Sequence, residues 1–81
     1  MLMQTEKAVL QIAEYTPRAC RNMKLFEAKA RLATKIALYI VDGCCDEVLN
    51  LAFKPALNCR TREQFFNHIQ QIKNGAGNVR F

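Results

Sequence analysis

The segment from residue 22 to residue 42 contains no glycine and no proline, and its apolar residues recur every three or four positions. Such spacing is typical of an amphipathic α-helix. At about 1.5 Å per residue this helix is about 31 Å long, the full width of a domain of this size. The apolar residues cover about half of the circumference of this helix. A face this broad predicts a central helix that contacts neighbours on more than one side. The apolar residues are Leu25, Phe26, Ala30, Leu32, Ala33, Ile36, Ala37, Ile40 and Val41.

Three further segments have the same periodicity, at 3–15, 44–53 and 62–73. We expect Pro17 and Pro55 to end the first and third helices, and Gly43 to end the second. The second helix begins either at residue 17, with Thr16 as its N-cap, or at residue 22. Thr61 and Gln64 have the spacing of a capping box before the fourth helix, and Asn74-Gly75 is expected to end it.

The chain contains three glycines and two prolines, too few for the many turns of an all-β fold. The sequence therefore predicts one all-α domain over residues 1–81. This domain is a compact bundle of three to four helices with a short C-terminal tail at 75–81.

The N-terminus lacks the basic and apolar regions of an export signal, and no apolar stretch approaches the length of a membrane span. We therefore expect a cytoplasmic protein with no membrane partner. The four cysteines, Cys20, Cys44, Cys45 and Cys59, contain no C-x-x-C pair, and His68 is the one histidine. Zinc sites normally show closely paired ligands. The expectation is four reduced thiols, with the cysteines acting as small core residues, and neither a metal nor a cofactor.

No arrangement of residues in the sequence points to catalysis. His68 has no evident nucleophile beside it, and Asp46 and Glu47 fall in the first turn of a helix, where its dipole favours negative charge. The glycines at 75 and 77 follow a helix, whereas a nucleotide-binding loop follows a strand. We expect no catalytic residues and a protein that is not an enzyme.

Positive charge is concentrated in one segment. Residues 18–35 contain six basic residues and one acidic residue, so they account for the whole net charge of +5. On a continuous helix one stripe is formed by Arg21, Lys24, Arg31 and Lys35. Ala28 lies within this stripe, and its small side chain leaves room there for the backbone of a partner. Arg18 and Lys29 fall on the apolar side of the same helix, at the rim of the stripe. Arg60 and Arg62 add charge near the fourth helix. The candidate partner-binding residues are Arg18, Arg21, Lys24, Lys29, Arg31, Lys35, Arg60 and Arg62.

Such a surface can bind an acidic partner. The first hypothesis is a small regulatory or inhibitory binding module that engages an acidic protein or a ribonucleoprotein through this basic helix face. An alternative is direct binding of DNA or RNA by the same stripe, extended by Arg60 and Arg62. A further alternative is a helical homodimer with a structural role, formed through Leu38 and Tyr39 beside the stripe.

Overall fold

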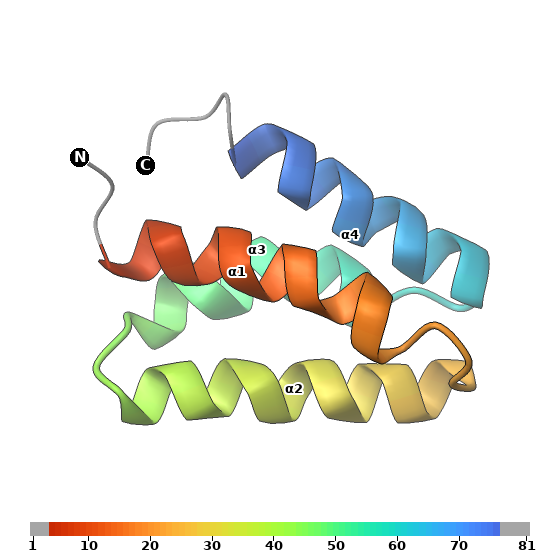
Figure 1. Ribbon diagram of the computed structural model, residues 1–81, viewed down its shortest axis with the longest axis horizontal. Helices are drawn as coiled ribbons and strands as arrows, with labels where there is room; N and C mark the ends of the chain where they lie inside the picture. The colour runs from red at the N-terminus through yellow and green to blue at the C-terminus, as the bar shows by residue number, and fades with distance from the viewer. Residues whose placement is uncertain (1–3, 77–81) are drawn as a thin grey trace.

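The computed structural model describes residues 4–76, and in this part of the chain all regular secondary structure is helical (Figure 1). The helices are α1 (Gln4–Ala19), α2 (Leu25–Val41), α3 (Asp46–Leu57) and α4 (Arg62–Ala76). The prediction of an all-α bundle is confirmed. Residues 77–81, which include most of the predicted tail, lie outside the described residues.

Helix α1 is the central element of the bundle. It packs against α2, α3 and α4, most extensively against α4, whereas α2 packs mainly against α1 and α3. Figure 1 shows α1 between α2 and α4, with α3 behind it. The prediction that α2 is central was therefore wrong. Its apolar surface is broader than the core can cover, and Phe26, Leu38 and Val41 are 71%, 56% and 83% exposed.

The core lies where the four helices meet. Its largest members are wholly or almost wholly buried, and they come from every helix: Val9, Ile12, Leu32, Leu49, Phe53, Phe65 and Ile69. The rings of Phe65 and Phe66 meet edge to face, with centroids 5.2 Å apart. Burial of such side chains is the main term that stabilises a bundle of this size.

The two prolines lie inside helices, where the sequence predicted helix ends. Each is in or near the last turn, so it removes one backbone hydrogen bond close to the helix terminus. Helix α1 continues through Pro17 because Thr16 and Cys20 on either side of it are fully buried. Thr16 also donates its hydroxyl to the Ile12 carbonyl at 2.7 Å, so it is not an N-cap. Helix α3 likewise continues through Pro55 to bury Ala56.

Two of the predicted helix boundaries are confirmed. Gly43 has a φ of +102°, and the turn after α2 is closed by hydrogen bonds from Gly43 to Ile40 and from Cys44 to Tyr39. This pattern is the Schellman motif, which favours glycine at the left-handed position. Thr61 accepts the backbone N–H of Gln64 at 3.1 Å and so caps α4.

The predicted end of the fourth helix was wrong. Helix α4 runs to Ala76 and includes Asn74 and Gly75. The Asn74 side chain accepts a hydrogen bond from Gln70 at 3.2 Å, one turn earlier, and this contact holds it along the helix.

Contacts distant in sequence fix α1 against α2 at both ends of the pair. At one end Thr5 accepts the N–H of Cys45 at 3.1 Å, and Gln4 donates to the Asp42 carbonyl at 3.3 Å. At the other end Arg62 binds the connection between the two helices. The relative position of α1 and α2, and the space between them, is therefore set by hydrogen bonds as well as by packing.

Candidate functional site

The structure divides the predicted basic stripe into two groups. Arg21 lies in the connection before α2 and Lys24 is the N-cap of that helix, whereas Arg31 and Lys35 lie two and three turns further along it. Ala28, predicted as the exposed middle of the stripe, is fully buried, and its carbonyl faces the Cys20 thiol at 4.0 Å. The single stripe was wrong because the helix does not extend back to Arg21.

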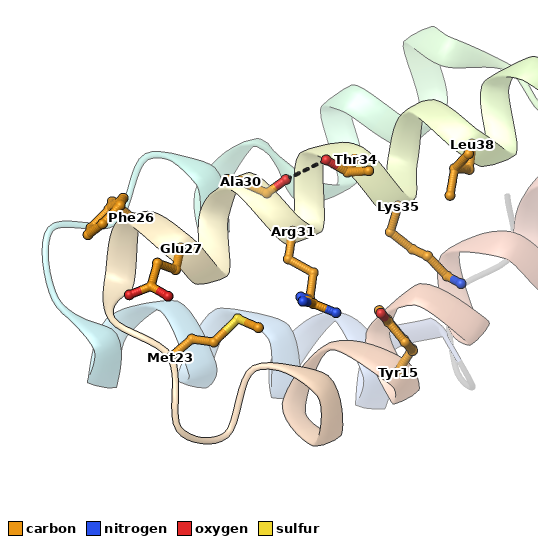
Figure 2. Close-up of a pocket in the computed structure, with 9 residues that line it drawn as sticks. All are labelled: Tyr15, Met23, Phe26, Glu27, Ala30, Arg31, Thr34, Lys35 and Leu38. Atoms are coloured by element: carbon orange, nitrogen blue, oxygen red, sulfur yellow. Dashed lines mark hydrogen bonds between the residues drawn. The ribbon is translucent and has the colours of Figure 1, made fainter.

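Arg31 and Lys35 line a groove of about 550 Å³ between α1 and α2. Figure 2 shows both side chains directed from α2 toward α1, where Tyr15 lies opposite. The lining residues are Tyr15, Met23, Phe26, Glu27, Ala30, Arg31, Thr34, Lys35 and Leu38. The groove therefore combines apolar walls with two cations, as ligand sites commonly do.

Lys35 is held in place by aromatic rings. Its ammonium lies 4.3 Å from the centroid of the Tyr15 ring and 5.9 Å from that of Tyr39. Cation–π contacts of this kind are worth about 0.5–1 kcal/mol at exposed sites. Tyr39 in turn donates its hydroxyl to Gln11 Oε1 at 2.7 Å, which fixes its ring. Lys35 thus presents an oriented positive charge to the groove.

Arg31 is exposed, and in the described part of the chain its guanidinium makes no hydrogen bond or ion pair. Its five N–H donors are therefore open to a carboxylate or phosphate. Its charge also acts inward, on Cys20. Burial raises the pKa of the Cys20 thiol, and the nearby Arg31 lowers that pKa by a smaller amount. Glu27, one turn before Arg31, places the groove's one negative charge toward the Phe26 end.

Phe26 and Leu38 mark the two ends of the groove along α2 and are largely exposed. They are 12 positions apart, or about 18 Å of helix. The apolar periodicity predicted that Phe26 is a core residue, and the sequence did not indicate that Leu38 lines a groove. One sequence feature could have indicated the groove: the apolar face of α2 is wider than its neighbouring helices can cover.

Arg62 has a structural contact that the sequence did not indicate. Its Nε donates to the Met23 carbonyl at 2.7 Å and its Nη2 to the Arg21 carbonyl at 2.6 Å. Its guanidinium also lies 5.1 Å from the Phe66 ring. A second, smaller hollow of about 340 Å³ is lined by Arg21, Asn22, Met23, Lys24 and Arg62. Much of the donor capacity of Arg62 is used to hold the connection before α2.

The remaining candidates lie apart from the groove lining. Arg18 and Arg60 are exposed, and Lys29 is half-buried, as a lysine whose stem lies along an apolar surface should be. Partner binding by each of these residues stays a prediction.

The residues that could carry metal or thiol chemistry are dispersed. Residues 4–76 contain no group of three or more His, Cys, Asp or Glu side chains placed to hold a metal ion. The four cysteines are free thiols. Cys20, Cys44 and Cys59 are buried, whereas Cys45, which was expected to be a core residue like the others, is exposed. None of helices α1–α4 has the length and apolar character needed to cross a bilayer.

Comparisons of the chain with protein-family models, with curated proteins and with solved structures gave no match.

Proposed function

We propose that this protein is a non-enzymatic binding module that engages an acidic protein partner through the α1–α2 groove. One observation carries the proposal: Arg31 and Lys35 project into a groove whose two ends are exposed apolar side chains, Phe26 and Leu38. Exposed apolar groups beside cations able to pair with carboxylates are features of protein-binding sites. A protein of this kind regulates or inhibits its partner by covering part of its surface.

Direct binding of DNA or RNA is less well supported by the arrangement of the cations. The nucleic-acid hypothesis needed one continuous basic stripe, extended by Arg60 and Arg62. The structure interrupts the stripe at the buried Ala28, and Arg62 donates to backbone carbonyls. Phosphate contacts supply most of the affinity in such complexes, so dispersed cations predict weak binding.

A titration with fluorescently labelled random duplex DNA and with single-stranded RNA tests this choice. We expect either no measurable binding or an affinity that changes little between 50 and 300 mM salt. Each phosphate neutralised steepens the slope of log affinity against log salt by about 0.7–0.9. A slope of several units would contradict the proposal if it is lost when Lys24, Arg31 and Lys35 are changed to alanine. That result would support nucleic-acid binding instead.

Affinity capture from a lysate of the source cells, with nuclease present, tests the proposal directly. The matched bait is a double variant, Arg31→Glu and Lys35→Glu, which reverses both groove charges. We expect a protein with an acidic surface that the wild-type chain retains, that the variant loses, and that binds again when both proteins are purified. Retention of the same proteins by both baits would contradict the role of the groove.

A further inference from the structure

We infer that the ligand of the α1–α2 groove is an amphipathic α-helix of three to four turns, apolar on one side and acidic beside it. This inference rests on the proposed function and specifies the partner. It follows from the shape of the exposed side of α2, from its length and from its charge.

The exposed side of α2 is largely apolar or small, apart from the exposed Glu27 and Arg31. Six exposed residues recur at helical spacing along it, namely Phe26, Ala30, Ala33, Thr34, Ala37 and Leu38. The large side chains lie at the ends and the small ones lie between them. Such a surface is low in its middle, so a second helix can approach to the 8–10 Å axis separation that is usual for packed helices.

The length of this surface sets the length of the ligand. The 12 steps of the helix from Phe26 to Leu38 span about 18 Å, and a partner helix lying along them needs about 13 residues. Its apolar side chains would recur at i, i+3 or i+4, and i+7, the pattern by which amphipathic helices bind in grooves.

Charge selects an acidic helix over a second copy of this chain. Residues 24–41 contain four basic residues and one acidic residue, a net charge of +3. Of these, Arg31, Lys35 and Glu27 line the groove, which gives the lining a net charge of +1. Pairing α2 with α2 of another copy would place two net-positive surfaces together, and like charges oppose such contact. Carboxylates on a partner helix would instead meet Arg31 and Lys35. Because Glu27 lies toward the other end, the acidic residues of the partner should gather in the half that faces Lys35.

The cations are suited to this role because they need little rearrangement. Lys35 is already positioned over Tyr15, and Arg31 makes no competing hydrogen bond or ion pair among the described residues. Binding therefore loses less side-chain entropy at Lys35 than it would at a freely rotating lysine.

A displayed library of random 16-residue peptides, selected on the wild-type protein, tests the inference without a known partner. We expect the enriched peptides to share apolar residues at helical spacing with Asp or Glu beside them, and to contain no internal proline. The selected peptides are then titrated by calorimetry against Phe26→Ser, Leu38→Ser and the charge-reversed double variant. Each is expected to weaken binding at least tenfold, the loss seen at central interface residues.

Two control variants on α3 match the groove variants in chemistry. Leu51 is 63% exposed and Lys54 is also exposed, and neither lines the groove. Leu51→Ser and Lys54→Glu should leave peptide affinity within twofold of wild type. Circular dichroism confirms that every variant is folded before it is titrated.

The outcomes separate the inference from the function on which it rests. Peptides that depend on Arg31 and Lys35 but not on Phe26 or Leu38, or that contain proline, would overturn the helical ligand and leave the acidic partner intact. If no peptide is enriched, or if the selected peptides bind the charge-reversed double variant as well as wild type, both the helical ligand and the acidic partner would be overturned. A dimer in sedimentation that Phe26→Ser abolishes would show that a second copy covers this face, and it would also overturn the inference.

Discussion

Replacing Arg62 with methionine should lower stability by about 2 kcal/mol, because it removes the contact between α4 and the connection before α2. The guanidinium donates to two carbonyls, those of Arg21 and Met23, and lies over the Phe66 ring. Hydrogen bonds to charged groups contribute about 1.5–3 kcal/mol when buried. Arg62 is exposed, so we assign each bond about 0.75 kcal/mol, half of the lower limit, and about 0.5 kcal/mol to the ring contact.

The measurement is urea unfolding followed by far-ultraviolet circular dichroism. For a domain of this size the loss corresponds to a fall in Tm of roughly 10 °C, with an unchanged dependence of the free energy of unfolding on urea. Arg62→Lys keeps the charge but cannot span both carbonyls, so it should lie between wild type and methionine.

Arg60→Met is the matched control for this experiment. The Arg60 side chain is exposed, and in the described part of the chain it makes no hydrogen bond or ion pair. Its replacement should change the free energy of unfolding by less than about 0.5 kcal/mol. If Arg62→Met and Arg60→Met are equally stable, the Arg62 guanidinium does not stabilise the connection before α2, and Arg62 is available to bind a partner.

Three further outcomes follow from the core, the α2–α3 turn and the buried thiol. Phe53→Ala should cost about 3–5 kcal/mol in urea unfolding, because it leaves a cavity at a fully buried site. Gly43→Ala should cost about 1 kcal/mol in the same assay. Its φ of +102° strains any side chain, although an added Cβ would meet nothing within 4 Å. Burial raises the pKa of Cys20 above 9.0. The unfolded chain therefore loses the thiol proton at a lower pH than the folded protein does. The stabilising contribution of the neutral Cys20 thiol is fully present below the unfolded-state pKa and is lost as pH rises through the higher folded-state pKa. Between pH 8 and pH 11 the wild type should lose more stability than Cys20→Ala; equal losses would contradict the shift.

The helices themselves could be predicted from sequence because their signals are local. Apolar periodicity located all four, and Gly43 and Thr61 marked boundaries that the structure confirms. Pro17 and Pro55 misled the prediction, since a proline near a helix end removes one hydrogen bond and the burial of neighbouring residues outweighs that loss.

The groove could not be predicted, because it depends on which part of α2 its neighbours leave uncovered. Periodicity places Phe26 on the same broad face as Leu32, and only packing against α1 and α3 distinguishes the exposed residue from the buried one. The sequence predicts one basic stripe, whereas the division of these cations into two groups follows from where α2 begins, at Leu25. Similarly, the carbonyls bound by Arg62 are about 40 positions away in sequence and leave no local signal.

The packing of α1 against α4 has a consequence for how the chain is made. Helix α1 packs more extensively against α4 than against α2 or α3, so part of its apolar face stays uncovered until residues 62–76 have been synthesised. Contacts that close such long loops form late in folding. Helices α1–α3 alone should therefore form a loose, incomplete core, and the groove acquires its final shape only when Arg62 reaches the connection before α2.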